Sequence, residues 1–301
     1  MVTLAGFGVT GAVLWASLTD SLETTTLAWV TLVATQLYVI GDHLDGLHAV
    51  ASGATSALGE FLDHWSDFLS GGILGLAAVT LMGPELDPWI RHGVLWLYAQ
   101  AFVVTYVERS ERSILYFAPV GSLEGIVILS VWLLAWLFPA GEAFMSGPSL
   151  LGGLPGYWTL LAIAAVCFGG TVIVLLRRIG RVPPYYLAFV VTSASIVAAA
   201  ALRPDLLPPP LGWGVLMLHG ADFLARVMQP QLFETGRRLW PDLFAPAALL
   251  GVVAWGTPSG GAAVAMWVTS GWALLSTART TGTVLHAFAE QWAWVNPDPP
   301  E

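Results

Sequence analysis

Apolar runs long enough to cross a lipid bilayer follow one another along this chain, separated by short segments rich in proline and glycine. A spanning helix needs about 20 mainly apolar residues. We expect ten such helices, at residues 3–18, 24–42, 64–83, 92–108, 119–139, 156–177, 184–202, 209–227, 240–256 and 262–279. The sequence therefore predicts an all-α, polytopic integral membrane protein.

The composition agrees with this prediction and excludes some functions. Of the 301 residues, 56% are hydrophobic and only 10% are charged, whereas soluble domains average about 25% charged residues. The net charge of −9 argues against nucleic acid as a partner, because phosphate binding depends on clustered Lys and Arg. The single cysteine, Cys167, lies in an apolar run and cannot form an intramolecular disulfide.

Four aspartates interrupt the apolar pattern between the second and third expected spans: Asp42, Asp45, Asp63 and Asp67. The first two are three residues apart and the last two are four apart, so each pair projects from one face of a helix. Two facing pairs make an oxygen-rich pocket that suits a hard divalent cation such as Mg²⁺. Residues 42–67 contain no Arg or Lys, and two divalent cations would supply the missing positive charge and clamp a pyrophosphate.

The spacing D-x2-D-G-x2-A-x9-G-x3-D-x3-D resembles the signature of the CDP-alcohol phosphotransferase family. The matching residues are Asp42, Asp45, Gly46, Ala49, Gly59, Asp63 and Asp67. The run L-G-E-F-L-D-H at residues 58–64 is similar to the L-G-E-L-F-D-H run of the choline and ethanolamine phosphotransferase branch, which also implies ten helices. The family has an arginine after the motif alanine, but Val50 stands here. Either a neighbouring group replaces that arginine or the activity of this member is altered.

The resemblance implies a role for each motif residue. Asp42, Asp45, Asp63 and Asp67 would bind two Mg²⁺ or Mn²⁺ ions. The residues Gly46, Ala49, Gly59 and Glu60 would lie against the bound substrate, where a glycine allows close approach of the nucleotide. His64 and Asp67 are the alternative bases that could take the proton of the acceptor hydroxyl. His64 is favoured, because an imidazole titrates near neutral pH.

Polar residues outside the motif give further hypotheses. Arg109 and Arg112 end the fourth expected span and would either meet the donor phosphates or serve only as solvated topology determinants. Glu124 is an intramembrane acid, which indicates a functional site by default. His219 and Asp222 form a second polar pair in the eighth span, for which a helix-packing hydrogen bond and a catalytic contact are both open.

The arginines indicate the orientation of the chain in the membrane. Alternation of ten spans places nine arginines on the face that carries the motif: Arg109, Arg112, Arg177, Arg178, Arg181, Arg226, Arg237, Arg238 and Arg279. Only Arg91 and Arg203 fall on the other face. By the positive-inside rule the aspartates face the cytoplasm, and the short loops without lysine suggest a prokaryotic plasma membrane. We expect a single transmembrane domain over residues 1–301, with a catalytic core at 1–140 and additional helices at 141–301.

The resemblance predicts an enzyme that moves phosphocholine or phosphoethanolamine from CDP-choline or CDP-ethanolamine to diacylglycerol and releases CMP. Relatives form dimers through membrane helices, so we also expect a homodimer. Three alternatives are open. The first is a phosphatidyltransferase that uses CDP-diacylglycerol. The second is a non-catalytic member that binds metal or nucleotide, and the third is a transporter whose aspartates bind coupling ions.

Overall fold

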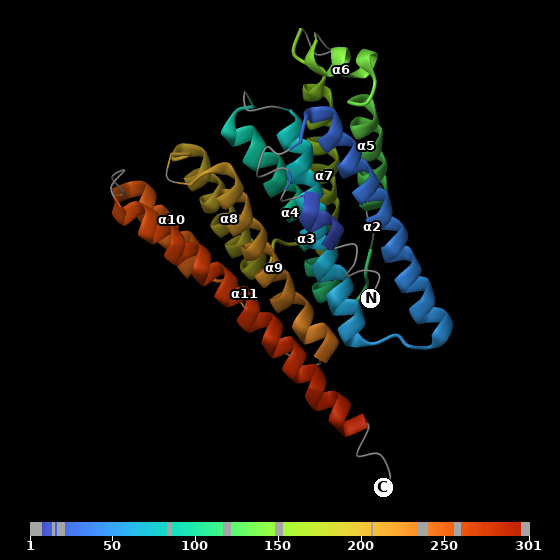
Figure 1. Ribbon diagram of the computed structural model, residues 1–301. Coiled ribbons are helices and arrows are strands. Elements are labelled where there is room, and N and C mark those ends of the chain that lie inside the picture. Colours follow the sequence, from blue (N-terminus) through green and yellow to red (C-terminus); the bar gives the residue numbers. More distant parts are fainter. Residues whose placement is uncertain are drawn as a thin grey trace.

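The computed structural model describes residues 8–13, 16, 22–82, 86–116, 122–147, 153–205, 207–233, 240–255 and 260–295. The helices are α2 (Thr24–Ser52), α3 (Ala57–Leu81), α4 (Pro88–Arg112), α5 (Ser122–Ala135), α6 (Pro139–Ser146), α7 (Tyr157–Ile179), α8 (Pro184–Leu202), α9 (Pro209–Phe233), α10 (Phe244–Trp255) and α11 (Gly260–Val295) (Figure 1). Helices account for nearly all of the described residues, and none of these residues forms a strand. The prediction of an all-α fold is confirmed for this part of the chain.

Nine of the ten expected spans coincide with a helix, from α2 to α5 and from α7 to α11. The first expected span, 3–18, lies largely outside the described residues, but 8–13 and 16 are helical. Three features were not predicted, and one of them is that α11 continues to Val295 rather than ending at residue 279. The helix α2 continues to Ser52 rather than ending at residue 42, and the short helix α6 follows α5 after a bend of 105°. Pro139 begins α6, where its fixed φ suits the first helical position.

Three of the described helices, α2, α7 and α8, are by themselves long and apolar enough to cross a membrane, and α5 with α6 makes a fourth if the bent pair is one span. The helices α3 and α4 carry charged side chains among their apolar ones. An integral membrane protein is therefore supported, whereas the crossing of about ten helices stays a prediction.

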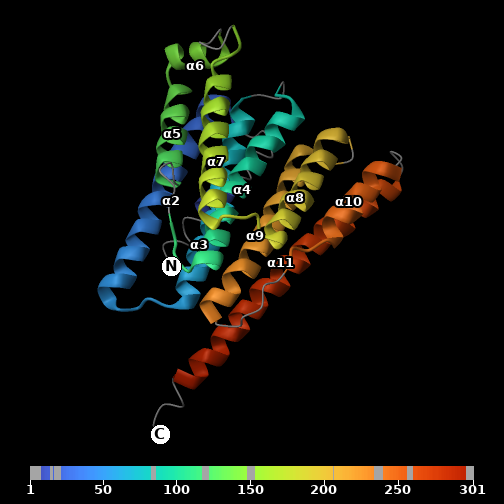
Figure 2. The ribbon, with the colours of Figure 1, turned by 180° about the vertical axis from the view of Figure 1, so that it is seen from behind.

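The helix α4 lies at the centre of the bundle and packs against α3, α7, α8 and α9 (Figures 1 and 2). The long helix α11 runs obliquely along the outside, against α9 and α10. Buried hydrogen bonds join the helices of this second half: Thr192 of α8 lies 2.8 Å from His219 Nε2 of α9, and Thr280 of α11 donates to Asp222. Arg226 also pairs with Asp222 at 2.8 Å. These contacts favour the helix-packing role for His219 and Asp222.

The turn between α2 and α3 brings the two halves of the aspartate motif together. Gly53 ends α2 with a φ of 66°, a left-handed conformation that glycine adopts without steric cost. The backbone N–H of Ala54 reaches back to the carbonyl of Ala49 at 2.9 Å, which is the bond of a Schellman cap. Ser56 then begins α3 by accepting a hydrogen bond from Gly59 N at 3.0 Å. The result is a helical hairpin with its carboxylate pairs opposite each other.

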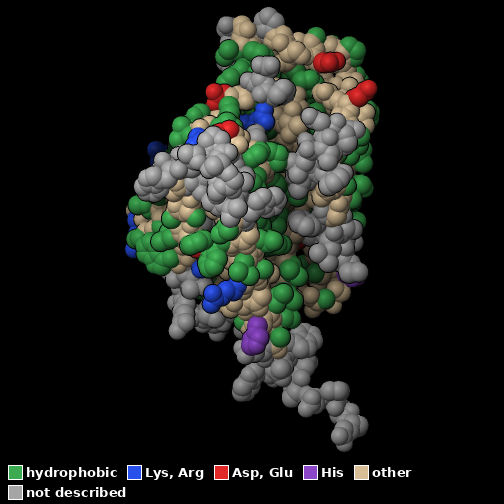
Figure 3. Space-filling view, turned by 60° about the vertical axis from the view of Figure 1, so that its left-hand side comes forward, with side chains coloured by type: hydrophobic (Ala, Val, Ile, Leu, Met, Phe, Trp, Pro, Cys, Tyr) green, Lys and Arg blue, Asp and Glu red, His purple; other side chains and the backbone are tan. Residues whose placement is uncertain are grey.

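The basic ends of several helices meet at the same end of the bundle as the motif. Arg178 Nε lies 3.0 Å from the fully buried Glu108, and Arg181 lies 2.9 Å from Glu111. These two ion pairs join the end of α4 to the end of α7 and the turn into α8. Three of the nine arginines that the sequence assigned to one side of the membrane, Arg112, Arg178 and Arg181, are therefore neighbours in space. On the face shown in Figure 3, hydrophobic side chains predominate and charged ones are few.

Candidate active site

Three of the motif carboxylates face one another between α2 and α3. The charge of Asp42 acts on both Asp63 and Asp67, and Asp45 is close enough to Asp63 for the two charges to interact. Ionised carboxylates accept hydrogen bonds but cannot donate them. Their mutual repulsion in a half-buried setting is costly unless a cation or a proton lies between them. The hairpin therefore brings Asp42 and Asp45 of α2 near Asp63 of α3.

Two tyrosines hold Asp67, the last aspartate of the motif. The hydroxyl of Tyr38 on α2 donates a hydrogen bond to Asp67 Oδ1. The hydroxyl of Tyr98 on α4 donates to the carbonyls of Phe68, at 2.9 Å, and Asp67, at 3.4 Å. The Tyr98 side chain packs against α3 at Gly71. A Cβ atom added at position 71 would lie 2.3 Å from the tyrosine oxygen. A residue with a side chain at position 71 would therefore displace Tyr98.

His64 lies among charged groups one helical turn before Asp67. Its Nε2 is 4.0 Å from Glu60 Oε1 and its Nδ1 is 3.9 Å from Asp63. Arg109 Nη1 donates a hydrogen bond to Glu60, so the end of α4 is fixed to the first turn of α3. The imidazole also packs on the ring of Tyr106, with 5.1 Å between centroids. His64 is thus oriented by groups on both helices.

These residues fit a divalent metal ion. Asp63, His64 and Asp67 each offer one ligand atom, and the three atoms lie within 4.8 Å of one another. Asp42 Oδ1 is buried and finds no hydrogen-bond partner among the described residues. An oxygen-rich set with an unsatisfied carboxylate oxygen is the donor chemistry that Mg²⁺ and Mn²⁺ prefer.

The other predicted residues lie at different distances from the carboxylates. Gly46 is exposed, and a Cβ atom there would meet nothing within 4 Å among the described atoms. Gly59 lies in the capped first turn of α3, and Ala49 lies in the last turn of α2. Val50, in the position of the family's arginine, is 72% exposed.

The two arginines at the end of α4 differ in their contacts. Arg109 reaches Glu60 beside the motif, whereas Arg112 points to the α7 side, where it lies 3.8 Å from Glu108 and donates to the carbonyl of Arg178. Glu124 belongs to the first turn of α5, but its side chain lies outside the described residues. Arg237 and Arg238 also lie outside them.

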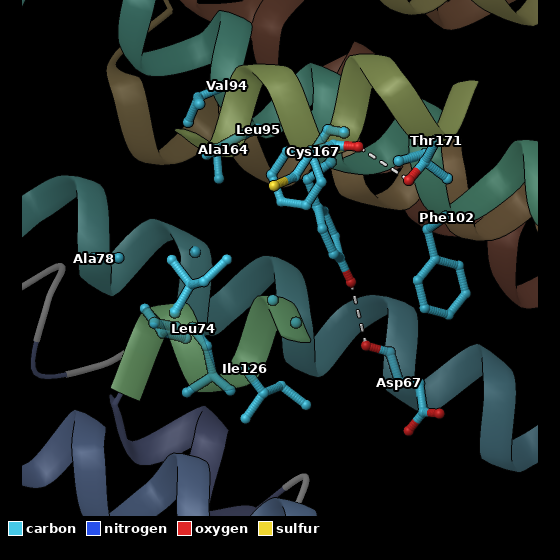
Figure 4. Close-up of a pocket in the computed structure, with 18 of the residues that line it drawn as sticks. Asp67, Leu74, Ala78, Val94, Leu95, Phe102, Ile126, Ala164, Cys167 and Thr171 are labelled. Carbon is cyan, nitrogen blue, oxygen red and sulfur yellow. Dashed lines mark hydrogen bonds between the residues drawn. The ribbon is translucent and has the colours of Figure 1, made fainter. Parts of the chain in front are cut away.

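A cavity of about 480 Å³ extends from the carboxylates into the bundle. Its charged and histidine lining, including Asp42, Asp63, His64 and Asp67, lies at one end, and the rest of its described lining is uncharged. Figure 4 shows Asp67 at that end, Ala78 towards the other, and Ile126 of α5 opposite Cys167 of α7. An acidic cluster that fits a metal ion and opens onto an apolar cavity is suited to a reaction between a phosphorylated compound and a lipid.

The sequence profile described as CDP-alcohol phosphatidyltransferase matches residues 1–168, which is more than half of the chain. The chain belongs to the CDP-alcohol phosphatidyltransferase family. Members of this family are membrane phosphotransferases of phospholipid synthesis that depend on divalent metal and use a CDP-alcohol and an alcohol acceptor, generally with a lipid as one substrate. Comparison with curated proteins gives no significant match.

The family match covers α2 to α5 and ends inside α7, at residue 168. It therefore includes every helix that contributes an aspartate, and α5 and the first half of α7, which close the cavity. The remaining helices, from α8 to α11, lie outside the match. Two of them, α8 and α9, pack against α4 and so help to hold α4 in place beside the site.

Sequence reasoning missed the tyrosines of this phosphotransferase site. Tyr38 precedes Asp42 by four residues on α2, so the helical period alone places it on the same face. Tyr98, Phe102 and Tyr106 follow one another at intervals of four on α4 and pack ring against ring. That spacing was a visible signal for an aromatic face, but its contact with α3 depends on helix packing.

Proposed function

We propose that this family member transfers phosphocholine or phosphoethanolamine from the CDP-alcohol to diacylglycerol, with release of CMP. The run at residues 58–64, which resembles that of the choline and ethanolamine branch, supports this choice. Within the run, Glu60 and His64 lie four residues apart and Arg109 holds Glu60 in place. In this chain the run therefore forms a defined local arrangement around the proposed base.

The observation that carries the proposal is the apolar cavity that opens at the carboxylates. It suits a lipid whose hydroxyl lies beside Asp67 and whose chain lies among the helices. A phosphorylated acceptor would instead need cations, but the described arginines nearest the motif have acidic partners: Arg109 contacts Glu60, and Arg178 contacts Glu108. A neutral lipid alcohol is therefore favoured as the acceptor.

The four aspartates, Asp42, Asp45, Asp63 and Asp67, would hold two Mg²⁺ or Mn²⁺ ions. When bound, these ions neutralise the pyrophosphate and stabilise the charge that develops on the departing CMP. His64 or Asp67 takes the proton of the acceptor hydroxyl. The hydroxyl oxygen then forms a bond to the phosphorus that carries the amino alcohol, the bond from that phosphorus to the bridging oxygen breaks, and CMP leaves with the electron pair.

The substrate contacts follow from the positions of the remaining residues. Gly46 leaves open space for the nucleotide, and Gly59 and Ala49 lie on the same helical hairpin. Arg109 would act on the substrate site through its ion pair with Glu60. We retain Arg112 and Glu124 as more distant contributors to the substrate site.

The placement of the enzyme in the cell is part of the proposal. The arginine distribution supports an active site on the cytoplasmic side, where soluble CDP-alcohols are found, in a membrane that we take to be a prokaryotic plasma membrane. We propose residues 1–140 as the catalytic core, residues 141–301 as additional helices, about ten spans in all, and a homodimer as the functional unit.

A phosphatidyltransferase that uses CDP-diacylglycerol is the second candidate, because its lipid donor would also place chains in an apolar cavity. A member that binds the nucleotide without turnover is the third, because Val50 replaces the family's arginine. Comparison of donors separates these candidates.

The test is CMP release and phospholipid formation by the purified protein with Mg²⁺, using CDP-choline, CDP-ethanolamine or CDP-diacylglycerol as donor. Diacylglycerol is the acceptor for the first two donors, and serine or inositol for the third. The proposal predicts a lipid product only with an amino-alcohol donor. A product formed only from CDP-diacylglycerol would assign the second candidate, and metal-dependent binding without CMP release would assign the third.

A further inference from the structure

A buried glutamate near the end of α4 is shared by two arginines. Arg178 Nε of α7 lies 3.0 Å from Glu108 Oε1, and Arg112 Nε lies 3.8 Å from the same oxygen. The side chain of Glu108 is fully buried, whereas 30% of Arg178 and 41% of Arg112 is exposed. One carboxylate charge therefore faces two guanidinium charges.

Further contacts hold the two guanidinium groups in place. Arg112 Nη1 donates a hydrogen bond to the backbone carbonyl of Arg178. The guanidinium of Arg178 lies over the ring of Tyr116, with its Cζ 3.7 Å from the ring centroid. Like charges that share one counter-ion repel each other. An anion bound to the exposed sides of these arginines would offset the repulsion that Glu108 alone leaves.

The unused donors of the two arginines suit a phosphate group. A guanidinium carries five N–H donors. Arg178 uses Nε for Glu108 and Arg112 uses Nη1 for the carbonyl of Arg178, so each group has donors left for another acceptor. Guanidinium groups bind the oxygens of a phosphate through charge-assisted hydrogen bonds.

The surroundings of this pair add positive charge. Arg177 is exposed and directly precedes Arg178, and Arg181 lies 2.9 Å from Glu111 in the turn that follows α7. Two glutamates, Glu108 and Glu111, thus face a cluster of four arginines, which has two positive charges in excess. The members of this arginine cluster are Arg112, Arg177, Arg178 and Arg181.

Apolar side chains beside the arginine cluster favour a lipid over a soluble phosphate compound. Ile173 is exposed and precedes Arg177 by four residues on α7, so the two lie on the same face of the helix. Val182 and Leu187, at the turn and on α8, are exposed as well. Exposed apolar patches of this kind lie against lipid in a membrane, and basic pockets between helix ends bind anionic headgroups.

The arginine cluster is separate from the candidate active site. Glu108, Arg112 and Arg178 are not among the described residues that line the cavity at the carboxylates. Arg178 also lies beyond residue 168, where the family match ends. A lipid bound at the cluster would therefore leave the motif aspartates accessible to substrates.

We propose that Arg112 and Arg178 bind the phosphate of an anionic phospholipid where the end of α4 meets α7 and the turn into α8. This lipid differs in class from the compounds of the proposed function, because diacylglycerol is uncharged and a phosphocholine or phosphoethanolamine lipid has no net charge. Arg112 is the one residue that the two proposals share, so the test measures lipid binding and not turnover.

The test uses the full chain purified in dodecyl maltoside, an uncharged detergent without phosphate. Dioleoylphosphatidylglycerol is added, and native mass spectrometry measures the bound lipid. Dioleoylphosphatidylcholine has the same chains but should bind about tenfold more weakly, because its choline cation meets the guanidinium groups. Equal binding of the two lipids would overturn the proposal. Displacement of phosphatidylglycerol by inorganic phosphate at an equal concentration would also overturn it, and would assign the cluster to a soluble phosphate compound.

Arg112→Gln should weaken the binding of phosphatidylglycerol by about tenfold, and it should fold because the pair of Glu108 and Arg178 is kept. The matched control is Arg203→Gln, which removes an arginine at the opposite end of α8, where Arg203 pairs with Asp205 at 2.9 Å. This control should bind the lipid as the wild type does. Equal weakening in the two variants would show attraction to the total charge of the protein and would overturn the site.

Glu108→Gln separates lipid binding from a purely structural role of the arginines. Loss of the buried carboxylate leaves both guanidinium groups without their counter-ion, so the variant should unfold at a lower temperature than the wild type in detergent alone. It should also bind phosphatidylglycerol more tightly, and a ligand of the folded state stabilises it. The lipid should therefore raise the unfolding temperature of Glu108→Gln by more than that of the wild type. An equal rise in both proteins would contradict the proposal.

Discussion

The phenol of Tyr38 donates its hydrogen bond to the carboxylate of Asp67 across the hairpin of α2 and α3. The bond joins the helix that carries Asp42 to the helix that carries Asp63, and it fixes one oxygen of Asp67. The other oxygen is left for a metal ion or for the acceptor proton. Tyr38 is therefore a positioning residue for the catalytic carboxylate.

We predict that Tyr38→Phe lowers kcat by about 10- to 100-fold, because a hydrogen bond to a charged group contributes about 1.5–3 kcal/mol. The KM for the CDP-alcohol should change little, because the phenol does not contact the donor in this account. The Mg²⁺ concentration at half-maximal rate should rise. Steady-state kinetics of CMP release at several Mg²⁺ concentrations measures all three quantities.

The control for this variant is Tyr186→Phe on α8. The hydroxyl of Tyr186 is buried and has no hydrogen-bond partner among the described residues, so its removal breaks no bond that the structure shows. If Tyr38→Phe kept the kcat and the Mg²⁺ dependence of the wild type, the positioning role would be wrong.

Glu60 and Arg109 should behave as one unit. The pair is half-buried, with 34% and 23% of the two side chains exposed, and removing one partner leaves the other charge unpaired beside His64. We predict that Glu60→Gln and Arg109→Met each reduce kcat/KM, and that the double variant is no worse than the more impaired single one. A double-mutant cycle on CMP release measures this coupling.

Arg203→Met is the control for that cycle, because Arg203 forms a similar pair with the exposed Asp205, and exposed pairs contribute little. The cycle also tests the alternative role of Arg109. Arg109→Met is therefore compared in two backgrounds, the wild type and Glu60→Gln. If it raised the KM for the CDP-alcohol equally in both, Arg109 would contact the donor phosphates and not act through Glu60.

We predict that Gly71→Ala destabilises the protein, because its Cβ would lie 2.3 Å from the Tyr98 oxygen. Overpacking of this kind costs about 1–3 kcal/mol. Tyr98→Phe in the same chain should recover part of the loss, because it removes the atom in closest contact. Thermal unfolding in detergent measures the effect. Gly93→Ala on α4 is the control, because a Cβ there meets no described atom within 4 Å, and equal effects of the two alanines would contradict the packing argument.

Val50→Arg tests whether the missing arginine limits this protein. Val50 is 72% exposed and is not among the described residues that line the cavity. We therefore expect the variant to fold normally, with a change of about 0.5 kcal/mol or less in unfolding free energy, and to release CMP at a similar rate. A large gain in CMP release would instead show that Val50 marks a member with impaired turnover.

The helices and the facing aspartates were predictable because both depend on local patterns. Apolar runs identify the helices from α2 onwards. Spacings of three and four residues place the carboxylates of Asp42 and Asp63 each on one face of a helix, and the short connection between the two helices places these faces opposite each other. The end of α2 was predicted ten residues too early, at 42 instead of Ser52, because hydropathy ends at the first charges while the helix continues to the glycine cap.

The contacts between distant parts of the chain were not predictable from patterns. Arg109 meets Glu60 across 49 residues of sequence, and nothing in either segment distinguishes that pairing from contact with a donor phosphate. The cavity depends on how α5 and α7 pack around α3, and no single sequence segment encodes it. Tyr98 was also hidden, because its approach to Asp67 requires both Gly71 and the crossing of α3 and α4.

The most direct test of the account is Mg²⁺-dependent CMP release by wild-type protein and by Asp63→Asn, with Asp87→Asn as the matched control. Asp87 caps the first turn of α4, and asparagine caps a helix as well as aspartate does. The account predicts that EDTA abolishes turnover of the wild type and that Mg²⁺ restores it. Asp63→Asn should be inactive at every Mg²⁺ concentration while keeping the wild-type unfolding temperature. Asp87→Asn should behave as the wild type. Normal turnover by Asp63→Asn would show that the aspartate cluster is not the catalytic metal site.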